Sequence, residues 1–183
     1  MFVSCGIFKE ELEYLIREKR LEGNILFLDA ALHVNFDKLK AKLKEALKAN
    51  LRAGEELKVI YGYCHPDIDS ILEPFGAKRT AAGNCLEAIV GADEIRKIDS
   101  DAKTFFLTSG WVNNWEKIFA MGVEDLDLDF TKLFVNYKRI IVFDSGVVPI
   151  DETKVDKLSL FANLPVERRK IDLEHLLDVL LSV

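Results

Sequence analysis

Short apolar runs alternate with amphipathic segments along most of the chain. These runs lack the strict polar alternation of a half-exposed strand, so they predict strands that are buried on both faces. Each run is followed by a small-residue or glycine turn. The predicted strands are Phe2–Ser4, Ile25–Leu28, Leu57–Tyr61, Thr104–Leu107 and Arg139–Phe143.

The segments between these runs carry apolar residues at helical spacing. Leu12, Leu15 and Ile16 form such a stripe after the first run, and Trp115 and Phe119 belong to another. Strands that alternate with helices are typical of a parallel sheet with helices on both faces. We therefore expect a single α/β domain over residues 1–183, built as a three-layer sandwich around a mostly parallel, doubly wound sheet of about five strands.

Residues 66–103 fit this alternation least well. Their pattern predicts two short helices, at Cys85–Val90 and Asp93–Ile98, and one extended piece at Lys78–Thr80. The basic triplet Arg168–Lys170 is interpreted as a solvated turn, with contact to an anionic ligand as the alternative.

Composition and charge narrow the class of protein. The chain has 183 residues with a formal net charge of −6, which does not favour binding to the phosphate backbone of nucleic acids. No apolar run approaches the roughly 20 residues of a membrane span, and Glu10 and Glu11 interrupt any signal-peptide pattern. We expect a cytoplasmic protein with neither nucleic-acid nor membrane partners. The glycine-rich fingerprints of dinucleotide and P-loop sites are also absent from the sequence.

Polar and small residues follow each predicted strand, where parallel α/β sheets bind their ligands. We expect a ligand or cofactor to contact residues of this kind. The candidates are Gly6, Gly62, Ser109, Gly110, Trp111, Asp144, Ser145 and Gly146. Trp111 either walls a pocket for a planar ligand or packs in the core, whereas Trp115 is predicted to pack in the core.

The chain's three cysteines also lie at strand ends or helix starts. Cys5, Cys64 and Cys85 could converge on one metal ion, with His65 or His33 as a further ligand. Nearby helix N-termini would lower the thiol pKa values and favour thiolates. Three cysteines suit zinc or, equally, a four-iron cluster with one iron open to substrate. Alternatively, each is a small buried side chain, since there is no Cys-x-x-Cys pair.

Two residues after the second predicted strand are candidates for proton transfer. Asp29 ends the segment Ile25–Asp29, and His33 follows four residues later. A histidine here could act as general acid or base, or could simply order the loop.

Several of these segments resemble a family called domain of unknown function 1638. The resemblance rests on segments that span most of the chain in order: Cys5–Ile7, Phe27–Ala30 with His33, Tyr61–Cys64, Cys85 ahead of Val90-Gly91, Leu107–Trp111 and Asp144–Gly146. It implies that the three cysteines are family features. The family's members, archaeal and bacterial, often lie beside corrinoid-dependent methyltransferase components.

This sequence departs from the family pattern at two places. The second cysteine is usually followed by glycine, whereas His65 stands here. The third is usually preceded by His-Asp, whereas Gly83 and Asn84 stand here. Either His65 substitutes for the missing histidine or both changes are neutral.

Two functions then compete. The first is a metal-dependent enzyme or accessory protein of corrinoid-linked one-carbon metabolism, in which zinc on the cysteines activates a thiol for methyl transfer and His33 or Asp29 handles the proton. The second is a non-catalytic module that holds a corrinoid or an iron–sulfur cluster for a partner such as a methyltransferase component. A metal-free alternative makes Cys5 a nucleophile assisted by His33.

Overall fold

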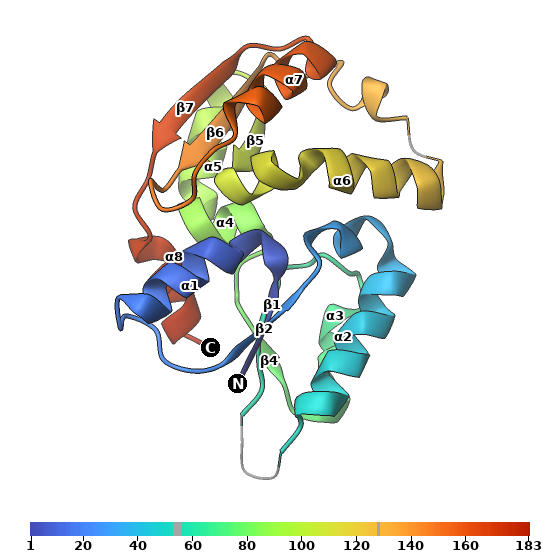
Figure 1. The fold of residues 1–183 in the computed structure, drawn as a ribbon, viewed down its shortest axis with the longest axis vertical. Helices are drawn as coiled ribbons and strands as arrows, with labels where there is room; N and C mark the ends of the chain where they lie inside the picture. The colour runs from blue at the N-terminus through green and yellow to red at the C-terminus, as the bar shows by residue number, and fades with distance from the viewer. Residues whose placement is uncertain (53–55, 128) are drawn as a thin grey trace.

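The chain folds around two parallel β-sheets, one from each half of the sequence (Figure 1). The computed structural model describes residues 1–52, 56–127 and 129–183. The first sheet has the strand order β2-β1-β3-β4 and the second the order β5-β6-β7. Their bounds are β1 Phe2–Cys5, β2 Ile25–Leu28, β3 Lys58–Ile60, β4 Lys78–Arg79, β5 Thr104–Thr108, β6 Arg139–Asp144 and β7 Val166–Lys170.

Helices connect the strands and cover the sheets. In chain order they are α1 Lys9–Arg17, α2 Phe36–Asn50, α3 Ile68–Leu72, α4 Cys85–Val90, α5 Ala92–Asp101, α6 Ser109–Leu126, α7 Glu152–Ala162 and α8 Glu174–Leu181. Short 3-10 helices add η1 Gly6–Phe8, η2 Ala30–Val34, η3 Glu73–Phe75 and η4 Phe130–Lys132. Among these helices, none is long and apolar enough to cross a lipid bilayer.

The predicted α/β class with parallel strands is confirmed, but the strands divide between two sheets rather than joining one sheet of about five. All five predicted strands are present, and the extended piece at 78–80 is the edge strand β4. β7 was not predicted, because Arg168–Lys170 is interpreted above as a turn. Most of its side chains face solvent, as an edge strand allows, so it has no apolar run.

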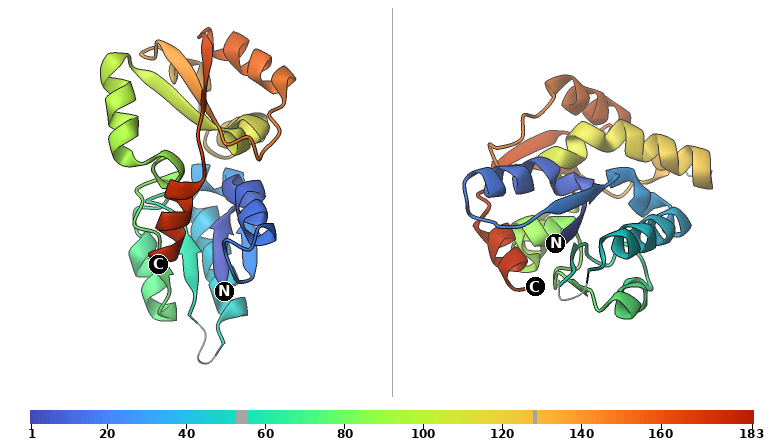
Figure 2. Two further views of the ribbon diagram at one scale, coloured as in Figure 1. Left: turned by 90° about the vertical axis from the view of Figure 1, so that its left-hand side faces the viewer. Right: turned by 60° about the horizontal axis from the view of Figure 1, so that its bottom comes forward.

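The two halves share one buried core. Val3 and Val59 of the first sheet belong to the same apolar cluster as Ile140 and Val142 of the second. The C-terminal helix α8 leaves the second sheet and packs against α4, beside the first sheet (Figure 2). Helix α6 crosses between the two sheets and contacts η1 and η2.

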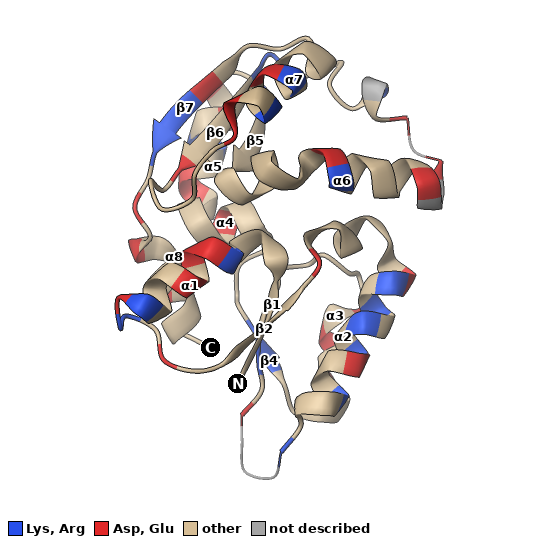
Figure 3. Cartoon of the chain, viewed as in Figure 1, with Lys and Arg blue, Asp and Glu red and all other residues tan. Residues whose placement is uncertain are grey.

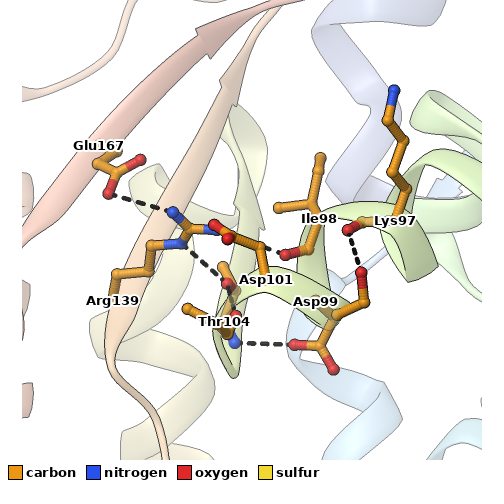
Figure 4. Close-up of polar contacts among 9 residues, drawn as sticks. Lys97, Ile98, Asp99, Asp101, Thr104, Arg139 and Glu167 are labelled. Carbon is orange, nitrogen blue, oxygen red and sulfur yellow. Dashed lines mark hydrogen bonds and ion pairs between the residues drawn. The ribbon is translucent and has the colours of Figure 1, made fainter.

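A half-buried guanidinium ties the strands of the second sheet together near their N-terminal ends (Figure 4). Arg139 of β6 donates to the Thr104 hydroxyl of β5 at 3.0 Å and pairs with Glu167 of β7 at 3.6 Å. It also contacts Asp101 at 3.2 Å, at the end of α5. These contacts hold the sheet at the end remote from the strand carboxyl ends.

The first sheet has its topological switch point between β1 and β3. From β1 the chain moves to β2 on one side and later returns to β3 on the other. A crevice forms at the carboxyl ends of two such strands, because the connections leave in opposite directions. Cys5 ends β1, and Cys64 follows β3, so both lie at this crevice.

Candidate functional site

A cavity of about 350 Å³ lies over the switch point of the first sheet. Its floor comes from the ends of β1 and β3 and the start of α4. Its other walls come from β5, α6 and η4, so both halves of the chain enclose it. Seven phenylalanine, tyrosine and tryptophan side chains line it: Phe8, Tyr61, Phe105, Phe106, Trp111, Phe119 and Phe130.

All three cysteines line this one cavity. Cys5 is buried, and Cys64 and Cys85 are half-buried. None of them forms a disulfide. Residues far apart in sequence meet here because the carboxyl ends of parallel strands share one edge of the sheet.

Glycine 62 brings the second and third cysteines together. A Cβ added to Gly62 would lie 2.3 Å from the Gly83 carbonyl oxygen. The same carbonyl accepts a 2.7 Å hydrogen bond from the Tyr63 amide. The segment after β3 therefore lies directly against the segment before α4, where Asn84 caps the helix by accepting from the amides of Leu86 and Glu87.

The thiols of this cavity are held in their neutral form. Burial raises the pKa of Cys5 far above its usual value, raises that of Cys85 to about 11, and raises that of Cys64. Charge on Cys64 or Cys85 raises the pKa of Cys5 further, so the three groups are close enough to interact electrostatically. The expectation of lowered pKa values was wrong, because desolvation outweighs the two short helices that begin beside Cys5 and at Cys85.

The three thiols share a cavity without forming a ready-made coordination sphere. Within residues 1–52, 56–127 and 129–183, no group of three or more Cys, His, Asp or Glu side chains has the arrangement that holds a metal ion. A metal ion here requires the thiols to converge and to lose their protons. Metal binding supplies the free energy for both changes in other thiolate sites.

The imidazole of His33 also lines the cavity, and its tautomer follows from its hydrogen bond. Nδ1 lies 2.6 Å from the Ala30 carbonyl oxygen, which can only accept, so Nδ1 carries the hydrogen. Burial lowers the pKa of His33, which leaves the ring neutral with a lone pair on Nε2. The ring packs edge-on against Trp111 at 5.0 Å between centroids. His33 can therefore accept a proton or coordinate a metal through Nε2.

Trp111 forms part of the cavity wall rather than of the closed core. Its indole Nε1 donates to the Cys85 sulfur at 3.3 Å. Trp115, one turn along α6, packs in the core as predicted and donates to the Lys154 carbonyl at 3.2 Å.

Tyr61 is a member of the cavity that the sequence analysis missed. Its hydroxyl is buried beside the Cys5 thiol, and it has no hydrogen-bond partner of good geometry among the described residues. Burial raises the pKa of this phenol well above its usual value, so it stays a neutral donor. Its position at the end of a predicted strand was the available signal. The sequence pattern did not single it out, because tyrosine also fits there as an ordinary apolar strand residue.

Several predicted site residues lie outside the cavity. Asp29 caps η2 through the Ala31 amide and pairs with Lys117 of α6. The buried His65 accepts a hydrogen bond from the Asp67 amide on Nδ1 at 2.9 Å, and its ring lies 5.5 Å from that of Phe36 at a tilt of 57°. Its contacts therefore order its own loop.

The other predicted ligand contacts, apart from Gly62 and Trp111, also lie outside the cavity. Gly6 and Gly110 allow close backbone contacts, because an added Cβ would lie 2.7 Å from the Leu28 oxygen and 2.2 Å from the Ile7 oxygen. Ser109 donates to the Phe143 carbonyl at 3.4 Å. A turn at the end of β6 contains the remaining three residues, Asp144, Ser145 and Gly146. In it the Asp144 carboxylate accepts a hydrogen bond from the Gly146 amide.

Comparison with known proteins agrees with the resemblance on which part of the sequence analysis rests. A family model described as protein of unknown function (DUF1638) matches residues 27–180. Neither the curated proteins nor the solved structures contain a match to this chain.

Proposed function

The chain belongs to the DUF1638 family, and we propose that this member is a metal-dependent protein whose cysteines bind one zinc ion at the floor of the cavity. One observation carries the proposal: Cys5, Cys64 and Cys85 come from three separate elements and line the same 350 Å³ cavity. Three thiolates suit a borderline-soft ion such as zinc, and a fourth position then remains open to a ligand.

His33 is the fourth protein group of this proposed centre. Its Nε2 lone pair is available because Nδ1 is bound to Ala30. Asp29, the other candidate for proton transfer, is paired with Lys117 outside the cavity. His33 therefore either completes the ligand set or accepts the proton of a substrate, while His65 takes no part.

The reaction class that we propose is methyl transfer to a thiol, in corrinoid-linked one-carbon metabolism. Zinc supplies the lowered thiol pKa that such chemistry needs. His33 Nε2 takes the proton of the substrate thiol, and the sulfur then forms its bond to the methyl group of the donor. The donor, a methylated corrinoid on a partner protein, leaves with the electron pair of the broken bond. The aromatic side chains that line the cavity exclude water from this step.

A second candidate is a binding module that holds an iron–sulfur cluster on the same three thiolates. The observation that favours it is the apolar wall around the cysteines, because burial of this kind tunes a cluster's reduction potential. The same volume argues against a corrinoid held wholly inside this cavity, since about 350 Å³ is near the lower limit for small-molecule sites.

Cobalt titration tests the proposed centre. Co²⁺ added to the reduced, metal-free chain is expected to give a thiolate-to-cobalt charge-transfer band that saturates at one equivalent and is reversed by zinc. Cys64→Ser is expected to weaken or abolish the band. Tyr63→Phe is the matched control, because Tyr63 is adjacent in sequence but exposed. An unchanged band in Cys64→Ser, or no band in the folded wild-type chain, contradicts the proposal.

A further inference from the structure

The lining of the cavity lacks the side chains that pair with charged ligands. In the described part of the chain, none of the lining residues is Asp, Glu, Lys or Arg. Charged residues lie on other elements, for example along α2 and β7 (Figure 3). A carboxylate, phosphate or ammonium group inside the cavity would lose its hydration without gaining an ionic partner among these side chains. The lining therefore disfavours any substrate that carries such a group.

Most polar side-chain atoms of the lining are already engaged or closed off. The Trp111 indole donates to the Cys85 sulfur at 3.3 Å. The side-chain oxygen of Asn84 caps α4, and its nitrogen donates to the Glu87 carboxylate at 3.0 Å. The Tyr61 hydroxyl is buried and closed to solvent, so a ligand cannot reach it. The three thiols and one imidazole nitrogen are what the described lining leaves for a ligand.

These remaining groups suit one sulfur atom. In the proposed centre the thiolates hold the metal, and the substrate sulfur is the group that binds beside them. The Nε2 atom of His33 is engaged in either of its proposed roles, as a metal ligand or as the acceptor of the thiol proton. A second polar group on the substrate would therefore be buried without a partner among the described side chains, which weakens binding.

The rest of the lining favours a small apolar body. Phe119 and Phe130 stack with ring centroids 4.2 Å apart and an interplanar angle of 5°, so they form a flat aromatic pair at the cavity. Phe105 is held edge-on against Phe134 at 5.0 Å. Aromatic walls of this kind pack well against alkyl groups and against another ring. A volume of about 350 Å³ is near the lower limit for small-molecule sites and suits a substrate of about one ring.

We infer that the substrate of the proposed methyl transfer is a small, uncharged alkyl or aryl thiol whose sulfur is its only polar group. The inference rests on the proposed function and names its substrate class. In the reaction the S–H bond breaks, its proton goes to His33 Nε2, and the sulfur forms its bond to the methyl group. The electron pair of the broken methyl bond stays with the donor. The product is a methyl thioether, which is also uncharged and apolar.

Three thiols with the same number of non-hydrogen atoms test the inference: 4-isopropylbenzyl mercaptan, 4-(mercaptomethyl)benzamide and 4-(mercaptomethyl)benzoate. They carry an apolar, a neutral polar and an anionic group at the end remote from the sulfur, where this group cannot chelate the metal that the sulfur binds. We refer to them as the isopropyl, amide and carboxylate thiols.

Two signals follow their binding. The first is the indole N–H resonance of Trp111 in the zinc-treated chain, which is assigned by Trp111→Phe. Trp115 is the internal control because it packs in the core outside the lining. The second is a shift of the visible absorption bands of the cobalt-loaded chain, which reports that the sulfur has reached the metal.

We expect the isopropyl thiol to shift both signals and to bind most tightly of the three. The amide thiol should bind about tenfold more weakly, because its amide loses hydrogen bonds to water and gains none. The carboxylate thiol should bind about a hundredfold more weakly, because its charge is desolvated without an ionic partner.

A lysine added to the lining should reverse the discrimination against charge. Leu133 lines the cavity and is 38% exposed, so lysine can replace it without burying a charge in the core. Leu133→Lys should bind the carboxylate thiol about tenfold more tightly than the wild type does, because the new ammonium group supplies the missing partner. Val135→Lys is the matched control, since Val135 is exposed and lies outside the lining. Its affinity for the carboxylate thiol should stay within twofold of the wild-type value.

Three results would overturn the inference: a carboxylate thiol that binds the wild type as tightly as the isopropyl thiol, an amide thiol that binds more tightly than the isopropyl thiol, or no shift of Trp111 with any of the three in a chain that holds cobalt. If Leu133→Lys fails to fold, the order of the three wild-type affinities decides. A folded chain that takes up neither cobalt nor zinc disproves the metal centre. The same order of affinities, measured by Trp111 in that metal-free chain, then decides separately which class of thiol the cavity accepts.

Discussion

The indole N–H of Trp111 donates a hydrogen bond to the sulfur of Cys85 across the cavity, at 3.3 Å. This bond joins the first turn of α6 to the first residue of α4. It is a polar contact between the two halves of the chain, and it acts directly on one of the three thiols.

Substituting Trp111 should therefore change the reactivity of Cys85. Burial is the largest influence on the Cys85 pKa and raises it to about 11, while the Trp111 hydrogen bond lowers it. Trp111→Phe removes the lowering contact, so the pKa should rise further. Alkylation of Cys85 by iodoacetamide at pH 9, followed by mass spectrometry, should slow about fivefold, the value of one net hydrogen bond. Faster alkylation would mean that the indole acts mainly as a steric shield.

Gly62→Ala should disturb the cysteines without touching them. The added Cβ would lie within 2.6 Å of backbone atoms of Gly83 and Asn84, which cannot move as a side chain can. We expect a loss of about 1–3 kcal/mol in the free energy of unfolding, measured in urea, and at least a tenfold weaker cobalt affinity.

Gly76→Ala is the control for Gly62→Ala. Gly76 has a φ of +59° but no atom within 4 Å of an added Cβ, so only backbone strain of about 1 kcal/mol should result. Its cobalt affinity should equal that of the wild type. Wild-type affinity in Gly62→Ala would disprove the role assigned to this close contact.

Glu11 should make the stability of the chain depend on pH. Burial raises the pKa of this carboxyl from its usual 4.5 to about 7, and the charge of Glu10 adds to the rise. The folded chain therefore holds a proton that the unfolded chain releases between these values, so this group's contribution to stability falls as the pH rises from about 4.5 to about 7. At 1.36 kcal/mol per pKa unit, proton linkage lowers the free energy of unfolding by roughly 3 kcal/mol over this range.

The comparison that isolates this effect is Glu11→Gln against the wild type. Other carboxylates contribute equally to both proteins, so the difference in free energy of unfolding should move in favour of the variant between pH 4.5 and 7 and stay constant above that range. Urea unfolding at a series of pH values measures it. A difference that does not vary with pH would disprove the raised pKa.

Asp29→Asn should have little effect on metal binding. The side chain caps η2 and pairs with Lys117 outside the cavity. Asparagine keeps the cap, and an exposed ion pair contributes at most about 1 kcal/mol, so stability should fall by less than that. Cobalt affinity should stay within twofold of the wild-type value. A tenfold loss of cobalt affinity would show that Asp29 contributes to the metal site.

The placement of Cys5, Cys64 and Cys85 around one cavity follows from one general property of parallel sheets, whose carboxyl ends share an edge. Each residue follows a strand or starts a helix that the apolar pattern identifies. The division into two sheets could not be predicted, since strand pairing is a non-local choice that periodicity does not encode. β7 was missed because Glu167, Arg168 and Arg169 give it the pattern of a polar loop.

The direction in which each side chain points could not be predicted from the sequence either. Cys64 and His65 are adjacent, yet Cys64 lines the cavity and His65 turns to the amide of Asp67. Tyr61 ends an apolar run and gives no sign that its hydroxyl lies buried beside the Cys5 thiol. Position at a strand end identifies the neighbourhood of a site, but local hydrogen bonds decide which side chains enter it.

Metal analysis of protein purified without oxygen tests the central claim most directly. We expect close to one zinc per wild-type chain, less than one tenth of that in Cys64→Ser, and wild-type content in Tyr63→Phe. Several irons per chain, with a broad brown absorption, would instead support an iron–sulfur cluster on the three cysteines. Folded, colourless wild-type protein that holds no metal, and takes up none when zinc is supplied, would contradict the claim that the three cysteines form a metal centre.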